Sequence, residues 1–216
     1  MKNDFPYDFI CIEGNIGAGK TSFCHLLQKE YNCSLVLEEF DQNPFLPYFY
    51  QDKDRYAFPV ELFFLTERYK QLENTLLKPD LFASFTAADY FFTKSLLFAQ
   101  NNLVPSEFRL FQKMFKALEP SFPNPEILVY FHRDVDILTD HIQKRGRDYE
   151  KFIKREYLLE IQNTYFDYFR NIVSFPVLII DLNKIDFLDD QRNYEAVKHI
   201  IKGKYLPGVH RISLIV

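Results

Sequence analysis

The chain has little of what marks several specialised classes of protein. Its 216 residues include no tryptophan, six glycines and three cysteines. Cys11, Cys24 and Cys33 are odd in number and lack the spacing of a metal site, so we expect reduced thiols in a cytoplasmic protein. No apolar run approaches ~18 residues, so no membrane span is expected. The formal net charge of −4 gives no indication of binding to nucleic acid or to an acidic membrane.

What is present is an ordinary globular composition with many aromatic rings. Apolar residues make up 47% of the chain and charged residues 26%, and there are 24 phenylalanines and 14 tyrosines. This length suits a single core, so we expect residues 1–216 to form one domain. The rings are expected mainly in that core, with some lining an apolar ligand slot or a subunit interface.

Hydrophobic patterns alternate between strand-like and helix-like along the chain. Strands are predicted at residues 7–12, 34–37, 81–88, 127–131 and 177–180. Helices are predicted at residues 21–31, 58–77, 194–201 and from Asp134, as the capping residue, to about Lys144. Strands that are apolar throughout and separated by helices predict an α/β fold with a buried parallel sheet. In such sheets the ligand lies beyond the carboxyl ends of the strands.

The most specific motif follows the first predicted strand. It matches the phosphate-binding P-loop pattern G-x-x-x-x-G-K-[ST], with a strand before it and a helix after it, at Gly14, Asn15, Ile16, Gly17, Ala18, Gly19, Lys20 and Thr21. Glycines let backbone N–H groups turn toward phosphate oxygens at the positive end of a helix. Lys20 is expected to bridge the β- and γ-phosphates of ATP, and the Thr21 hydroxyl to bind Mg²⁺.

A basic cluster, KRGR at residues 144–147, predicts a lid. Phosphoryl transfer needs cations near the equatorial oxygens of the transferring group. Arg145 and Arg147 flank Gly146, so we expect a mobile lid at about residues 144–155 that carries both arginines. The alternative is a solvated basic helix end, favoured by the helix dipole.

The P-loop and the basic cluster indicate an enzyme that transfers phosphate from ATP, that is, a kinase. Two other nucleotide-dependent functions are alternatives to this interpretation. Residues 183–186 spell N-K-x-D, which reads guanine in GTPases, but no glycine follows an aspartate by three residues, so the γ-phosphate sensor of a GTPase is absent. A nucleotide-binding module without catalysis is the second alternative. Consumption of ATP only in the presence of a nucleoside separates a kinase from both.

Several segments resemble the bacterial deoxynucleoside kinases, the deoxyguanosine kinases first and the deoxyadenosine kinases next. These are EEFDQNPFL at 38–46, FPVELFFLTERYKQL at 58–72, ADY at 88–90, LFA at 97–99 and RGR at 145–147. The resemblance runs from the P-loop to about Tyr157. It implies a P-loop NTPase-type three-layer sandwich with a five-stranded parallel sheet, a homodimer, ATP and Mg²⁺. The implied reaction is ATP-dependent phosphorylation of the 5′-hydroxyl of a deoxynucleoside, with nucleoside monophosphate kinase activity as a further alternative.

The resemblance also assigns expected roles to individual residues. Glu38 is similar to the general base, and Lys20, Arg145 and Arg147 to the catalytic cations. Thr21 and Asp89 match the magnesium neighbourhood. The remaining substrate-binding positions are Tyr50 and Glu150 at the 3′-hydroxyl, Glu61 and Arg68 at the base, and Phe98 as the ring that stacks on the base. A tyrosine ring beneath C2′ implies a preference for deoxyribose, and the loop around residues 186–190 resembles the one that holds the donor adenine.

Two departures from the resemblance concern charge near the reacting phosphate. Many members carry an arginine directly after the acidic residue of strand three, where this chain has Tyr90, and a further lid arginine where it has His141. A third difference concerns the base, because many relatives that act on pyrimidines or on a broad range of nucleosides have glutamine at the position of Glu61. An ionised carboxylate offers only acceptors, which match the adjacent N1–H and N2–H donors of guanine. The sequence therefore predicts deoxyguanosine over deoxyadenosine, and both over pyrimidine nucleosides.

Overall fold

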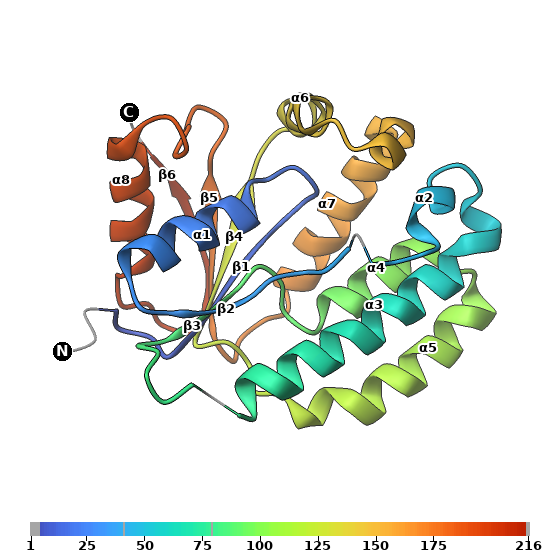
Figure 1. Ribbon diagram of the computed structural model, residues 1–216, viewed down its shortest axis with the longest axis horizontal. Helices are drawn as coiled ribbons and strands as arrows, with labels where there is room; N and C mark the ends of the chain where they lie inside the picture. The colour runs from blue at the N-terminus through green and yellow to red at the C-terminus, as the bar shows by residue number, and fades with distance from the viewer. Residues whose placement is uncertain (1–4, 41, 79, 215–216) are drawn as a thin grey trace.

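The computed structural model describes residues 5–40, 42–78 and 80–214. Within these residues six parallel strands form one sheet in the order β2-β3-β1-β4-β5-β6 (Figure 1). The strands are β1 (Phe9–Gly14), β2 (Ser34–Val36), β3 (Thr86–Ala88), β4 (Ile127–His132), β5 (Pro176–Asp181) and β6 (Gly208–Ser213). The predicted parallel α/β sheet is confirmed, and β6 extends it at one edge from five strands to six.

Helices connect successive strands and cover both faces of the sheet. They are α1 (Lys20–Glu30), α2 (Leu46–Phe49), α3 (Lys53–Leu76), α4 (Lys94–Asn102), α5 (Pro105–Leu118), α6 (Val135–Arg145), α7 (Arg155–Phe169) and α8 (Gln191–Ile201). Short 3-10 turns, η1 (Glu119–Ser121) and η2 (Asp148–Phe152), follow α5 and α6. Figure 1 shows α1 and α8 on one side of the sheet and α3, α4, α5 and α7 on the other. The three-layer P-loop NTPase architecture predicted from the sequence is therefore present.

The sheet is buried because its central strands are apolar on both faces. Every residue of β1 is buried, and so are the first five residues of β4 and of β5. One apolar cluster packs α3, α4, α5 and α7 on the sheet, and a second packs α1, α6 and α8 on its opposite face. Parallel strands covered by helices on both faces need this near-continuous hydrophobicity.

Two predicted boundaries differ from the structure. The third strand was predicted over residues 81–88, but only Thr86–Ala88 pair in the sheet, and Leu81 and Phe82 are 91% and 86% exposed. Helix α3 begins five residues before the predicted start, at Lys53, where the Asp52 carboxylate accepts a hydrogen bond from the Arg55 N–H. Such a side-chain cap satisfies an otherwise unpaired N–H of the first turn.

Strand register fixes where the polar motifs lie. Val36 of β2 pairs with Ala88 of β3, and Cys11 of β1 also pairs with Ala88. Glu38, Asp89 and the P-loop after β1 therefore leave the sheet at the same carboxyl edge. The strand order places β1 between β3 and β4. The chain therefore continues from β1 to β2 and β3 on one side of it, and then crosses to β4 on the other side. In open α/β folds, ligands bind at the carboxyl ends of the strands where the strand order reverses in this way.

The three cysteines are buried free thiols, as the sequence predicts. Among the described residues, no helix combines the length and the apolar character needed to cross a membrane.

Candidate active site

A cavity with an internal volume of about 90 Å³ lies at the carboxyl edge of the sheet. Most of the residues selected from the sequence line it: Gly14, Ile16, Gly17, Lys20, Thr21, Glu38, Tyr50, Glu61, Arg68, Asp89, Phe98, Arg145, Arg147 and Glu150. The other P-loop residues lie outside this lining, because Asn15 and Ala18 are buried and Gly19 borders a neighbouring groove.

The P-loop has the backbone conformation that its glycines allow. Gly17 and Gly19 have φ angles of 83° and 93°, which other residues rarely adopt. A Cβ at Gly17 would lie 2.9 Å from the Leu138 carbonyl oxygen of α6, so this close approach also requires glycine. The Asn15 side chain donates to the Leu158 carbonyl at 2.7 Å and fixes the loop against α7. These contacts hold the loop in the shape expected for a phosphate cradle.

Lys20 lies inside this loop and is half-buried. Its Nζ donates to the Asn15 carbonyl oxygen at 3.0 Å. Burial, followed by the like charge of Lys94, lowers the pKa of Lys20 to about 8. Both effects disfavour the ammonium, and a bound phosphate would favour it.

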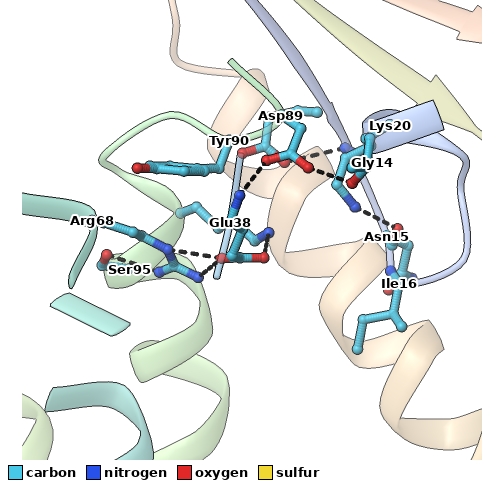
Figure 2. Close-up of polar contacts among 12 residues, drawn as sticks. Gly14, Asn15, Ile16, Lys20, Glu38, Arg68, Asp89, Tyr90 and Ser95 are labelled. Carbon is cyan, nitrogen blue, oxygen red and sulfur yellow. Dashed lines mark hydrogen bonds and ion pairs between the residues drawn. The ribbon is translucent and has the colours of Figure 1, made fainter. Parts of the chain in front are cut away.

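Glu38 lies at the centre of a charged network between β2 and α4. Arg68 of α3 donates to Glu38 Oε1 through Nε, at 2.9 Å, and through Nη2, while Arg68 Nη1 donates to Ser95 at 2.8 Å. Lys94 donates to the other carboxylate oxygen at 2.6 Å. Figure 2 shows Glu38 between Arg68 with Ser95 on one side and Asp89 with Lys20 on the other. Burial opposes ionisation of Glu38, but the charges of Lys94 and Arg68 outweigh burial and hold its pKa well below the usual range.

Thr21 and Asp89 bring together two oxygen-bearing side chains that can bind a metal ion, beside the P-loop. The Thr21 hydroxyl donates to Asp89 Oδ2, and the Glu38 N–H donates to Asp89 Oδ1 at 2.8 Å. Burial and then the charge of Glu38 raise the pKa of Asp89, and a bound cation would oppose both effects. Among the described residues no three His, Cys, Asp or Glu side chains form a metal cluster. A hydroxyl beside one carboxylate suits Mg²⁺, which keeps several waters and takes further oxygens from phosphate.

At the base-binding position predicted from the sequence, Glu61 of α3 is 1% exposed and accepts a hydrogen bond from α4. Asn102 of α4 donates to Glu61 Oε1 at 2.6 Å and to the Tyr157 hydroxyl of α7 at 3.2 Å. Glu61 Oε2 has no hydrogen-bond partner among the described residues. Burial raises the pKa of Glu61 to about 7, although the Asn102 hydrogen bond and the Arg68 charge act in the opposite direction. The cavity therefore contains a buried carboxyl oxygen that needs a partner.

The predicted lid connects α6 to α7. Gly146 ends α6 with φ 71°, and η2 follows. Arg145 donates to both oxygens of Glu150, at 3.0 and 2.6 Å, and Arg147 donates to Glu150 Oε1 at 3.4 Å. The Arg147 guanidinium also lies 3.8 Å from the centre of the Phe40 ring. Both predicted lid arginines are thus tied to Glu150, while Tyr50, the other residue predicted at the 3′-hydroxyl, lines the same cavity.

Sequence reasoning missed three residues that organise the site. Lys94 and Asn102 begin and end α4, from which only Phe98 was selected, and neither fits a motif we recognised. Glu13, directly before the P-loop, is fully buried and accepts hydrogen bonds from the N–H groups of Gly14 and Phe91 and from the Tyr165 hydroxyl. A charged residue at the end of an otherwise apolar strand was the available signal for Glu13.

A neighbouring groove lies on the outer side of the P-loop. It is bordered by Gly17, Gly19, Arg133, His141 and residues 183–189. Asn183 of the N-K-x-D sequence accepts a hydrogen bond from the Asp134 N–H at 2.6 Å, which holds its loop against the start of α6. His141, at the position of the missing lid arginine, contacts the Gly17 carbonyl oxygen through Nδ1 at 2.9 Å.

Known proteins resemble this chain along most of its length. Deoxyguanosine kinase of Bacillus subtilis (strain 168) is 32% identical over 201 residues, which cover 90% of this chain and 96% of that protein. Deoxyadenosine/deoxycytidine kinase of the same organism is 27% identical over 195 residues, with 87% and 88% covered. A structure of deoxyadenosine kinase from M. mycoides, with dCMP and dCDP bound, has a TM-score of 0.77 at 21% identity and covers 89% of this chain and 97% of that one.

The likeness to the solved structure establishes the fold, and the sequence matches establish the family. The family model described as deoxynucleoside kinase matches residues 10–205, which include the P-loop, Glu38, Asp89 and the lid. The resemblance noted from short motifs thus extends over nearly the whole chain. The chain is therefore a phosphotransferase with an alcohol acceptor and belongs to the deoxynucleoside kinase family.

Proposed function

We propose that this kinase transfers the γ-phosphate of ATP to the 5′-hydroxyl of a purine deoxynucleoside, with deoxyguanosine preferred, in nucleotide salvage. The observation that carries the proposal is the buried, unpartnered Oε2 of Glu61 in the same cavity as the P-loop and Glu38. The P-loop accounts for the donor phosphates, Glu38 for the reacting hydroxyl and Glu61 for the base.

In this proposal the chain positions two substrates and moves one proton. Glu38 accepts the proton of the 5′-hydroxyl as the oxygen bonds to phosphorus, and Lys20 neutralises charge that develops on the phosphates. Arg145 and Arg147 approach the transferring group when the lid closes, which requires their contacts with Glu150 to rearrange. Thr21 and Asp89 would hold Mg²⁺, whose charge would screen the phosphate oxygens. The outer groove with residues 186–190 receives the donor adenine.

The preference for guanine follows from hydrogen-bond geometry at Glu61. Its Oε2 can accept from guanine N1–H, and Oε1, which already accepts from Asn102, has a second lone pair for the N2 amino group. Arg68 uses three of its five N–H donors on Glu38 and Ser95, so two remain for guanine O6 or N7. Phe98 stacks on the base from the wall of the cavity. A mismatched base leaves a buried acceptor unpaired, which costs about 1–3 kcal/mol.

Deoxyadenosine is the second candidate substrate, and a specific observation favours it. Because burial raises the pKa of Glu61 to about 7, a protonated Glu61 is accessible near neutral pH. A carboxylic acid presents one donor and one acceptor, which match N1 and the N6 amino group of adenine. The names of the B. subtilis relatives, one a deoxyguanosine kinase and one a deoxyadenosine/deoxycytidine kinase, are consistent with either base.

The sugar contacts, oligomeric state and location belong to the same proposal. Tyr50 and Glu150 line the cavity and are proposed to hold the 3′-hydroxyl, with a tyrosine ring too close to C2′ for a ribose hydroxyl. We also propose a cytoplasmic homodimer, and sedimentation of the purified protein tests the dimer.

Phosphate transfer to a panel of nucleosides tests the function. Rates with ATP and Mg²⁺ should rank deoxyguanosine first, deoxyadenosine next and the pyrimidine deoxynucleosides last, with adenosine below deoxyadenosine. Highest kcat/KM for a pyrimidine nucleoside would contradict the proposed role of Glu61. ATP consumption without any nucleoside acceptor would contradict the kinase reaction itself.

A further inference from the structure

Lys94 places a buried ammonium beside the proposed general base. This lysine is the first residue of α4, is 3% exposed and lines the cavity. Its Nζ lies 2.6 Å from Glu38 Oε2, and no other hydrogen-bond partner of this nitrogen is present in the part of the chain that the structure describes. An ammonium has three N–H donors, and burying it is costly unless its charge and its donors are matched. Two donors of Lys94 are therefore available to a ligand.

The two ammonium groups of Lys20 and Lys94 favour an anionic ligand. The single carboxylate of Glu38 is shared between Arg68 and Lys94, and Glu13 and Asp89 also attract Lys94. The ammonium of Lys94 also repels that of Lys20, and after burial this repulsion is the largest effect that lowers the pKa of Lys20. Glu13 and Asp89 attract Lys20 and offset part of the repulsion. A buried and a half-buried ammonium group that repel each other bind a phosphate jointly with a larger gain than either would alone.

A continuous chain of contacts connects Lys94 to the P-loop. Lys94 contacts the Glu38 carboxylate, the Glu38 N–H donates to Asp89 at 2.8 Å, and Asp89 accepts from the Thr21 hydroxyl. If Glu38 hydrogen-bonds to the 5′-hydroxyl, Lys94 lies within about 6 Å of the reacting oxygen. The flexible four-carbon stem of lysine can cover that distance by rotamer changes.

We propose that Lys94 is a catalytic residue. During transfer its ammonium breaks the hydrogen bond with Glu38 and binds a non-bridging oxygen of the transferring phosphoryl group. The inference rests on the proposed function. As O5′ bonds to phosphorus, the bond from phosphorus to the β–γ bridging oxygen breaks, and its electron pair goes to the departing ADP. The hydroxyl proton passes to Glu38, where the departure of Lys94 has freed Oε2, and Lys94 keeps its own proton. Its charge balances the negative charge on the equatorial oxygens.

This role explains how the loop after β3 provides a cation despite Tyr90. Tyr90 carries no charge at neutral pH, is buried and donates its hydroxyl hydrogen to Gln71 at 2.7 Å, away from Glu38 (Figure 2). Lys94 follows four residues later, at the start of α4, and its ammonium lies at the carboxylate instead. The structure thus assigns to α4 a charge that position 90 does not supply.

Single-turnover transfer from ATP and from ATPγS, which has sulfur in place of one non-bridging γ-oxygen, tests the proposal. Sulfur accepts hydrogen bonds from an ammonium weakly, so a direct contact makes the ATP-to-ATPγS rate ratio depend on Lys94. We expect Lys94→Met to lower the rate with ATP by about 100-fold. Because the thio rate should fall less, the ratio should decrease by about tenfold. Lys94→Arg should restore most of the ratio.

Lys198→Met is the matched control, since it removes another buried ammonium. Lys198 lies on α8 and forms an ion pair with Glu30 of α1 at 2.5 Å. The substitution should lower the melting temperature and leave both rates and their ratio unchanged. If Lys94→Met does not fold, Lys94→Gln, which keeps a donor to Glu38, carries the same test. A folded Lys94 variant with the parent's ratio, whatever its absolute rate, would show that Lys94 only positions Glu38 and would overturn the inference. A parent enzyme that phosphorylates no deoxynucleoside would overturn the proposed function as well.

Discussion

At the residue scale, the two adjacent carboxylates after β2 have different surroundings. Glu38 faces the cavity and is held by Arg68 and Lys94, whereas Glu39 is exposed and accepts a hydrogen bond from Gln42 at 2.7 Å. Consecutive residues of an extended segment point in opposite directions. A substitution at Glu39 therefore serves as the control for the same substitution at Glu38.

We predict that Glu38→Gln lowers kcat by about 10²–10⁴-fold, because the 5′-hydroxyl loses its proton acceptor. Glu39→Gln should change kcat by less than about twofold, because its side chain lies outside the cavity lining. Steady-state assays with saturating ATP measure both effects, and circular dichroism checks that Glu38→Gln is folded. A larger loss in Glu39→Gln would assign the base to the other carboxylate.

The base preference should depend on pH because Glu61 titrates near neutrality. Below its pKa of about 7 the carboxylic acid suits adenine, and above that pH the carboxylate suits guanine. The ratio of kcat/KM for deoxyguanosine to that for deoxyadenosine should therefore rise from pH 6 to pH 8, by up to about tenfold per unit below the pKa. Titration of Lys20 affects both substrates alike, so it cancels in the ratio.

Glu61→Gln is the control for this pH effect, because an amide does not titrate. The variant should have a ratio that is independent of pH and shifted toward deoxyadenosine. Equal slopes in parent and variant would show that another group, such as one on the substrate, causes the dependence.

Sequence reasoning selected most of the residues with polar side chains that line the cavity, but not all of their contacts. Positions 61 and 68 are on one face of α3, as their seven-residue spacing requires, and both side chains are buried at the site. Spacing cannot show that Arg68 turns toward Glu38, which is distant in the sequence, because that contact depends on how β2 and α3 pack. Lys94 and Asn102 were missed for the same reason, since each acts through a partner on another element.

At the scale of elements, patterning predicted five strands, including the edge strand β2, and missed the other edge strand, β6. β1, β4 and β5 are apolar runs that two helical layers bury. In β6 half-buried and exposed residues alternate, including His210 and Arg211, so this strand does not have the continuous apolar run of a central parallel strand. The lid was predicted from Arg145, Gly146 and Arg147, and the structure adds Glu150 as the group that holds both arginines.

We predict that the lid closes over the substrates and becomes resistant to protease. Arg145 and Arg147 are bound to Glu150 in the structure, and phosphates of a bisubstrate analogue should attract them into the cavity. Tryptic cleavage within residues 145–155 should slow by about tenfold with the analogue bound, as local opening becomes less frequent. Cleavage after Lys204, which is exposed between α8 and β6 at the opposite edge of the sheet, should not change. Equal slowing at both places would indicate general stabilisation and not lid closure.

At the scale of the whole molecule, the site lies where the two helical layers meet the carboxyl edge of the sheet. Glu61 contributes from α3, Asn102 from α4 and Tyr157 from α7, so the proposed base-binding end is built into the apolar layer that supports the sheet. A carboxyl group at this position reduces the stability of the fold whenever it is ionised, because its charge is removed from water. The proposed function and the stability of the fold are therefore opposed at Glu61, and the opposition can be measured.

We predict that Glu61→Gln stabilises the protein against unfolding more at pH 8 than at pH 5. The unfolded chain releases the Glu61 proton near its ordinary pKa of 4.5, whereas the folded protein retains it up to about pH 7. In the parent this carboxyl therefore costs nothing below pH 4.5, costs more as pH rises to 7, and has its full cost above pH 7. Glutamine is neutral throughout and can keep the hydrogen bond with Asn102. Urea unfolding without ligand should give a difference between variant and parent that grows by about 2 kcal/mol from pH 5 to pH 8. An equal difference at both pH values would mean that Glu61 titrates normally in the folded protein, and would remove the basis for a pH-dependent choice between guanine and adenine.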